Sequence, residues 1–204
     1  MKKLWLAALV FSSSFVAQAA SQADVLKEKL ARLHSYQASF EQKVVDASGK
    51  LVQEEGEGVL SLRHPSMFRF ETVTPEPNLF IGNGVTLWHY NEVLEQVSIY
   101  DAQKEVNLTP FVLLTSNDAR LWAQYDVSGQ GEQFVIRSKD PNSAVPQLTL
   151  NFAGTGFESM TVLDQSGQTS HFEFVAVQTN TRLDPALFRP NLPANVAIED
   201  LRNK

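Results

Sequence analysis

The hydrophobic positions of the chain recur with two different periods. Near the N-terminus, Leu26, Leu30 and Leu33 are spaced as on one face of a helix with charged residues between them, which predicts a helix over 22–34. From Tyr36 onward apolar and polar residues alternate, as in half-buried strands. Strands are predicted at 36–44, 51–62, 67–74, 78–81, 85–90, 93–100, 125–128, 133–138, 147–152, 157–164 and 169–178.

Two apolar helical segments interrupt this series of strands. Thr109 can cap a helix that has Pro110 at its first position, and residues 111–114 are wholly apolar. Ser116 can cap a further turn that reaches Trp122. The connections between strands are short, so the strands are predicted to be antiparallel. The pattern therefore predicts a mainly β fold of the α+β class, with about eleven strands in a strongly curved sheet covered by short helices.

The first nineteen residues have a pattern of their own. Lys2 and Lys3 precede an apolar run, and residues 17–19 read Ala-Gln-Ala, the small-x-small pattern of a cleavage site. Serines interrupt the apolar run, which argues against a membrane-spanning helix. We expect residues 1–19 to be a cleaved signal peptide and residues 20–204 to form a single domain.

Charge and cysteine content narrow the possible partners. Without Lys2 and Lys3 the chain has 15 basic and 23 acidic side chains, a formal charge of −8, which disfavours nucleic acids and anionic membrane surfaces. The chain has no cysteine, so it can form no disulfide and carry no thioether-linked lipid. These features predict an exported protein that is not stably inserted in a membrane.

The residues that usually carry catalysis form no recognisable motif. The histidines His34, His64, His89 and His171 lack metal-ligand spacing, and there is no nucleophile elbow, Gly-rich phosphate loop or zinc-protease motif. We therefore predict neither an enzyme nor a metal or cofactor site. The alternative of an enzyme or enzyme accessory that acts on envelope lipids or glycans stays open, with a carboxylate such as Asp164 or Glu173 as the acid or base.

The richest aromatic stretch lies between residues 60 and 90. Phe68 and Phe70 share one face of a predicted strand, Arg69 and Glu71 share the other, and an alternating aromatic pattern returns at 88–90. His64 has the same parity as Phe68, so its polar ring needs a partner on the inner face. The aromatic face can either fill a core or line a cavity, and the pattern leaves both interpretations open.

Six short motifs occur in an order that is similar to one protein family. They are S-F-E-Q at 39–42, G-E-G at 56–58, H-P-S-M-F-R-F at 64–70, T-L-W-H-Y-N at 86–91, T-P-F at 109–111 and D-P-A-L-F-R-P at 184–190. With the signal sequence, they make the chain resemble the periplasmic outer-membrane lipoprotein carrier (LolA) family over essentially its whole mature length.

The resemblance implies an incomplete β-barrel with a helical lid, whose hydrophobic cavity takes the acyl chains of lipoproteins. It implies a periplasmic, monomeric carrier that receives acylated lipoproteins from an inner-membrane ABC transporter and delivers them to an outer-membrane lipoprotein receptor. That receptor needs a lipidated N-terminal cysteine, which this chain lacks. The alternative to a lipoprotein carrier is an envelope folding chaperone whose groove binds apolar protein segments.

The inner faces of the strands and helices predict the residues of the site. The cavity is expected to be lined by Phe40, Phe68, Phe70, Leu79, Ile81, Trp88, Tyr90, Leu148, Leu150 and Phe172. The lid is expected to contain Leu26, Leu30, Phe111, Leu113, Leu114, Leu121 and Trp122.

One position departs from the family pattern. The resemblance implies an Arg-Pro pair where this chain has His64-Pro65, and that arginine is expected to bind the lid backbone when the cavity is closed. His64 can donate to a lid carbonyl, although with fewer donors and with a charge that depends on pH near neutrality. Arg63 should point to the opposite face of the strand. We therefore expect His64 to be the lid latch and lid closure to be weaker or pH-sensitive.

Overall fold

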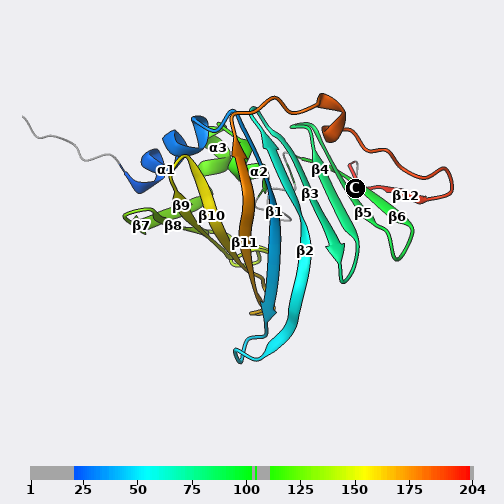
Figure 1. Ribbon diagram of the computed structural model, residues 1–204, viewed down its shortest axis with the longest axis horizontal. Helices are drawn as coiled ribbons and strands as arrows, with labels where there is room; N and C mark the ends of the chain where they lie inside the picture. The colour runs from blue at the N-terminus through cyan, green and yellow to red at the C-terminus, as the bar shows by residue number, and fades with distance from the viewer. Residues whose placement is uncertain (1–20, 103, 105–110, 203–204) are drawn as a thin grey trace, which may run out of the picture.

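The computed structural model describes residues 21–102, 104 and 111–202, with only the backbone of Glu54. One curved sheet of twelve strands wraps around the helices α1, α2 and α3 (Figure 1). The strands are β1 (Ser35–Val45), β2 (Leu51–Arg63), β3 (Met67–Thr74), β4 (Asn78–Gly82), β5 (Thr86–Asn91), β6 (Gln96–Asp101), β7 (Tyr125–Gln130), β8 (Gln133–Ser138), β9 (Gln147–Ala153), β10 (Gly156–Leu163), β11 (Thr169–Thr179) and β12 (Ala197–Asp200). The helices are α1 (Gln22–Ala31), α2 (Phe111–Thr115), α3 (Ala119–Trp122) and the 3-10 turn η2 (Pro185–Phe188).

The sheet is open, as the family resemblance implied. Its strand order is β12-β6-β5-β4-β3-β2-β1-β11-β10-β9-β8-β7, so β12 and β7 form the two edges among the described residues. Neighbouring strands are antiparallel except for β12, which runs parallel to β6. The predicted count of about eleven strands missed β12, and the prediction of antiparallel pairing throughout was wrong for this strand. A four-residue strand whose partner lies about a hundred residues away leaves little periodicity to detect.

The long strands β1 and β2 bend at the centre of the sheet. Their pairing shifts register between Gln42 and Val45, as β-bulges do when they curve a sheet. Gly58 allows a close approach between β1, β2 and β3, because a Cβ there would clash with the Phe40 ring and the Glu71 carbonyl oxygen. The curvature gives the sheet a concave face on which the helices pack.

Helix α1 begins where its capping residue predicts. Ser21 has an extended backbone, and its hydroxyl accepts a hydrogen bond from the Asp24 amide at 3.2 Å. Leu26 and Leu30 are buried against the concave side of the sheet. The helix ends at Ala31, three residues before the predicted end, and Leu33 stays buried beyond it.

Helices α2 and α3 occupy the middle of the concave face, and all five residues of α2 are buried. The residue that caps α3 is Asp118, which accepts from the Arg120 amide at 2.8 Å, and not Ser116 as predicted. The Ser116 hydroxyl instead accepts from the Asp118 amide, and its carbonyl accepts from the Trp122 indole at 2.9 Å. The predicted helix start at Thr109 and Pro110 and the signal peptide at 1–19 lie outside the described residues.

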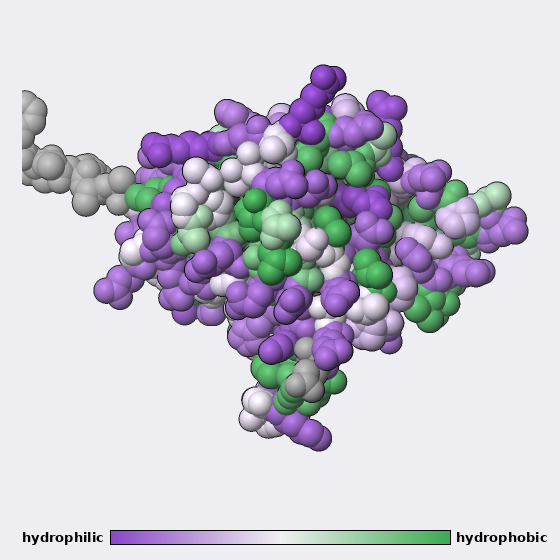
Figure 2. Space-filling view, viewed as in Figure 1, coloured by the Kyte–Doolittle hydropathy of each residue, from purple (hydrophilic) through white to green (hydrophobic). Residues whose placement is uncertain are grey.

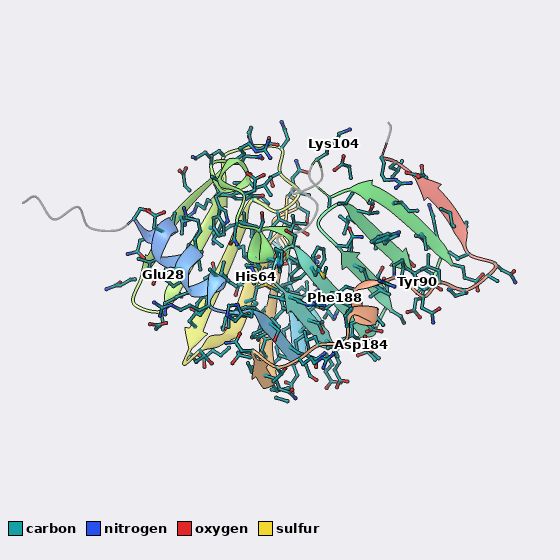
Figure 3. The ribbon with its side chains drawn as sticks, turned by 90° about the horizontal axis from the view of Figure 1, so that it is seen from above. Glu28, His64, Tyr90, Lys104, Asp184 and Phe188 are labelled. Carbon is teal, nitrogen blue, oxygen red and sulfur yellow. The ribbon has the colours of Figure 1, made fainter. Side chains whose placement is uncertain are left out.

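The C-terminal segment covers part of the outer face of the sheet. After β11 the chain crosses the top of the molecule in Figure 1, and η2 packs against β3. Figure 3 shows η2, with Phe188, on the side of the strands away from α2. Leu79, Ile81 and Val97 are buried on this side together with Phe188. The sheet between β3 and β6 is therefore apolar on both faces.

The rest of the outer surface is mixed. Figure 2 shows apolar side chains scattered among hydrophilic ones on the outer face. The β1–β2 hairpin projects at the bottom of this view and carries the exposed Leu51 and Val52. Among the described residues, no helix is both long enough and apolar enough to cross a bilayer.

Candidate functional site

The centre of the concave face is a stack of aromatic rings from four different elements. Phe70 of β3 lies between Phe40 of β1 and Phe111 of α2, with ring centroids 4.9 Å and 4.5 Å away. Phe172 of β11 meets Phe40 edge-on at 5.2 Å. Each such pair contributes about 0.5–1.5 kcal/mol beyond its area burial. The stack therefore joins α2 to the sheet through aromatic contacts.

A second aromatic group extends the interior toward β8 and β9. Tyr36 stacks on Phe157 at 4.2 Å, and its hydroxyl donates to the Phe157 carbonyl oxygen at 2.9 Å. Burial raises the pKa of the Tyr36 phenol, so this group stays neutral. Phe157 also meets Phe174 at 5.3 Å, and Phe134 meets Phe152 at 5.7 Å. Both groups belong to one continuous apolar cluster.

Helix α2 closes this interior with its own side chains. Phe111, Leu113 and Leu114 are each at most 5% exposed and belong to the same cluster as the sheet aromatics. The helix packs against β2, β3 and α1. The space between the helices and the sheet is therefore filled by α2 in this conformation.

The C-terminal end of α2 is held by the turn between β2 and β3. The Ser66 amide donates to the Thr115 carbonyl oxygen at 2.9 Å, and the His64 ring hydrogen-bonds to the backbone of Leu114. His64 thus points inward, as its parity predicted. Its Nδ1 atom is buried and has no hydrogen-bond partner in the described structure.

The surroundings of His64 favour its neutral form. Burial lowers the pKa of this ring below its ordinary value, and the nearby His34 lowers it further. The hydrogen bond to Leu114 acts in the opposite direction, as an accepting carbonyl does, but it is the smallest of the three effects. A neutral imidazole donates one hydrogen bond, and here α2 receives it.

A cleft of about 460 Å³ lies at the other end of β3. Phe70 and Phe80 supply its apolar lining, and Gln42, Thr72 and His89 are among its polar lining residues. The His89 ring stacks on Phe80 at 4.0 Å. Phe70 borders both the cleft and the aromatic stack. Its volume is within the range of small-molecule sites.

The predicted cavity residues divide into two groups. Those on the concave face, all in the apolar cluster, are Phe40, Phe68, Phe70, Leu148, Leu150 and Phe172. Those on the opposite face are Leu79, Ile81, Trp88 and Tyr90.

The placement of the second group in the cavity was wrong, and the strand register gives the reason. Ile81 and Leu79 pair with Arg69 and Glu71, the outward residues of β3. Trp88 and Tyr90 pair in turn with Ile81 and Leu79. A sheet that is covered on both sides has apolar residues at both parities, so alternation alone does not orient β4 and β5.

Several inward residues were missed by the sequence analysis. On β4, β5 and β6 the inward apolar side chains are Phe80, Leu87 and Tyr100, which lie in or against the cluster. The sequence could have indicated Phe80, because it lies between Leu79 and Ile81. Side chains alternate along a strand, so Phe80 points to the opposite face from both. All seven predicted lid residues lie in the cluster or, for Leu121, packed against it.

The residues proposed for catalysis are not brought into this interior. The Asp164 carboxylate accepts from the Ser166 and Gln168 amides and so stabilises the turn between β10 and β11. Glu173 lies between Phe172 and Phe174 on β11 and therefore faces outward, where it pairs with Glu41. Among the described residues there is also no group of three metal-ligating side chains.

An open, strongly curved sheet whose apolar concave face is filled by short helices defines the class of open half-barrels with a helical lid. Residues 31–191 match the family described as outer membrane lipoprotein carrier protein LolA, and the chain belongs to this family.

Curated relatives and a solved structure agree with that assignment. The chain is 36% identical to an outer-membrane lipoprotein carrier protein of Vibrio cholerae, over 98% of each chain. It is 38% identical to the protein of the same name from Pseudoalteromonas translucida, over 98% of this chain and 95% of that one. A LolA superfamily protein from Nitrosomonas europaea, 10% identical, has the same fold with a TM-score of 0.50 over 84% of this chain and 99% of that chain.

Proposed function

We propose that this protein is a periplasmic carrier that holds the acyl chains of lipoproteins in the space now filled by α2. The observation that supports this function is the double role of the aromatic stack. Phe40, Phe70 and Phe172 belong to the sheet, whereas Phe111 belongs to a five-residue helix. Withdrawal of α2 uncovers an apolar wall without breaking a strand pair.

The lid side chains and an acyl chain gain similar free energies when they leave water. Burying one side chain such as Phe111, Leu113 or Leu114 contributes about 1.5–3 kcal/mol, so the three together contribute roughly 5–9 kcal/mol. A long acyl chain that leaves water gains about 0.8 kcal/mol per CH₂, or roughly 10 kcal/mol. An acyl chain can therefore replace the lid residues with a small net change, which suits a carrier that must also release its cargo.

The route of the cargo follows from the same proposal. Residues 1–19 direct export and are removed, and the monomeric domain 20–204 works in the periplasm. It receives lipoproteins from an ATP-driven transporter of the inner membrane and delivers them to a lipoprotein receptor of the outer membrane. No step of this route needs covalent chemistry, a metal or a cofactor.

The direct test is displacement of a hydrophobic dye by an acylated lipoprotein. The purified protein should bind the dye, and the acylated lipoprotein should displace it, whereas the same lipoprotein without acyl chains should not. Equal displacement by both forms would instead support a chaperone for apolar protein segments. Dye binding no greater than that of a well-packed globular protein would refute a cavity of either kind.

A pair of variants locates the cargo on the concave face. Phe70→Glu places a carboxylate at the junction of the stack and the cleft, and we expect it to reduce dye and lipoprotein binding at least tenfold. Val175→Glu adds the same charge at an outward position of β11 that is 47% exposed, and we expect no loss. Circular dichroism and thermal unfolding of both variants identify any loss that results from unfolding.

A further inference from the structure

A basic depression lies beside the turn that holds α2. It has a volume of about 350 Å³ and is formed by the start of β1, the end of β2 and the segment that follows β11. Figure 3 shows His64 near the centre of the molecule, between α1 and the C-terminal turn η2. The depression is distinct from the aromatic stack and from the cleft beside Phe80.

Hydrogen bonds between distant parts of the chain fix the walls of this depression. The His34 amide donates to the Asn180 side-chain oxygen at 2.7 Å, and the Ser35 hydroxyl donates to the Thr181 carbonyl oxygen at 2.6 Å. The His64 amide donates to the His34 carbonyl oxygen at 3.0 Å. The depression is therefore formed by ordered backbone and does not depend on the conformation of one loop.

The charge of the lining contrasts with that of the whole protein. The chain has a net charge of −6, yet the charged and titratable residues that line this depression are His34, Arg63, His64 and Arg182, without a carboxylate among them. Helix α2, which packs beside His64, contains no charged residue. The nearest acid in sequence, Asp184, caps η2 by accepting from the Ala186 amide and is not part of the lining.

The two guanidinium groups lack the carboxylate partners that four other arginines of this protein have. Four arginines form ion pairs with carboxylates, namely Arg32, Arg69, Arg120 and Arg202. In the part of the chain that the structure describes, the side chains of Arg63 and Arg182 form neither a hydrogen bond nor an ion pair. A planar guanidinium offers a fork of N–H donors that matches phosphate oxygens. Two such forks on one depression, with no acid present, are the arrangement expected of a phosphate site.

We propose that this depression binds a phosphate group, held by the guanidinium groups of Arg63 and Arg182 and lying beside the imidazoles of His34 and His64. The phosphate can belong to a small soluble ester or to a phospholipid headgroup, since both present the same oxygens. The negative charge of the whole protein opposes long-range attraction to an anionic surface, so the local site has to supply the affinity.

Phosphate in this site acts on α2 through His64. A bound anion favours the protonated imidazole, and a protonated donor makes a stronger hydrogen bond to the Leu114 carbonyl oxygen. Phosphate should therefore hold the end of α2 in place under mildly acidic conditions. This inference does not rest on the carrier function, because an anion can bind here whether or not the interior takes acyl chains.

The four histidines of the chain permit a direct test by NMR. The imidazole signals of the untagged protein are followed from pH 5 to 8 in a buffer without phosphate, with sodium phosphate or with sodium chloride at equal ionic strength. We expect phosphate to shift the signals of His34 and His64 and to strengthen proton binding at His64 about tenfold. The signals of His89 and His171, which lie outside the depression, should not respond.

Matched variants connect the shifts to the depression. The double variant Arg63→Gln/Arg182→Gln should lose the phosphate response, whereas Arg137→Gln, on the exposed surface of β8, should keep it. An equal response to chloride, an equal shift of all four histidines, or an unchanged response in the double variant would each overturn the proposal.

Vesicles distinguish the two sources of phosphate. An anionic lipid headgroup is the ligand if the protein sediments with phosphatidylglycerol vesicles and not with phosphatidylcholine vesicles. Inorganic phosphate should then abolish this sedimentation, and the double variant should not show it. A histidine response to glycerol 3-phosphate without vesicle binding would identify a soluble ester. If neither glycerol 3-phosphate nor vesicles bind and inorganic phosphate gives no response, the depression is not a phosphate site.

Discussion

Replacement of Phe111 by alanine should open the lid while leaving the sheet folded. The Phe111 ring lies 4.5 Å from the Phe70 ring and 5.7 Å from the Phe68 ring, and it is 5% exposed. A buried phenylalanine lost to alanine costs about 3–5 kcal/mol. If α2 opens locally, the substitution destabilises the closed state by this amount and leaves the free energy of the open state unchanged. The open population should then rise at least a hundredfold, since about 1.4 kcal/mol corresponds to a factor of ten.

Amide hydrogen exchange measures this opening at a single bond. The Ser66 amide donates to the Thr115 carbonyl oxygen, so it exchanges when α2 leaves the turn. The amides of β1 that pair with β2 and β11 exchange only when the sheet opens. In Phe111→Ala, we expect exchange at Ser66 to accelerate much more than exchange at the centre of β1.

The matched control is Phe134→Ala. Phe134 is fully buried on β8 and meets Phe152, and none of its aromatic contacts involves α2. This variant should lose a comparable free energy of unfolding, measured with denaturant, without selective exchange at Ser66. Equal acceleration at Ser66 and in β1 of Phe111→Ala would mean that α2 is an inseparable part of the core, which would refute the lid.

Two further predictions concern pH and the bend of the sheet. Because burial lowers the pKa of His64 below its ordinary value of about 6.5, the closed state is fully stable above that pH and loses stability as the pH falls toward the lowered value. Exchange at Ser66 in phosphate-free buffer should therefore accelerate from pH 7.5 to 5.5, after correction for the intrinsic rate, and His64→Gln should remove this dependence. A dependence that survives in His64→Gln would assign it to another group, such as His89. Gly58→Ala should cost about 1–3 kcal/mol by denaturant unfolding, because the added methyl meets Phe40 and the Glu71 carbonyl; an unchanged midpoint would contradict the close packing.

The sequence was most informative where one face of a strand meets water. In β3, Phe68 and Phe70 are buried, while Arg69 and Glu71 face outward and form an ion pair at 2.8 Å. Because Arg69 and Glu71 are polar and alternate with Phe68 and Phe70, the sequence of β3 alone indicates which of its faces points to water. The direction of His64 followed from the same count, and its bond to Leu114 agrees with it.

The sequence was least informative where long-range packing decides the environment. Leu79 and Ile81 are buried on the face of the sheet where η2, about a hundred residues later in the chain, packs against the neighbouring strand β3, so no local pattern marks this face as the outer one. The parallel pairing of β12 with β6 is another long-range contact of this kind. The error at the start of α3 has a local cause, because Ser116 and Asp118 are both good caps and only the backbone path decides between them.

Under the proposed carrier function, the core and the cavity interpretations of the aromatic face describe two states of one structure. A permanently empty apolar cavity costs about 24 cal/mol per Å³, so 400 Å³ would cost roughly 10 kcal/mol. The free energy of unfolding of a whole domain is about 5–15 kcal/mol, so an unfilled cavity of that size would remove most or all of its stability. The protein solves this by filling the space with Phe111, Leu113 and Leu114 on a short helix that His64 and Ser66 hold at one end. Under the proposed carrier function, the core that stabilises the empty protein is the same surface that an acyl chain would cover after α2 withdraws.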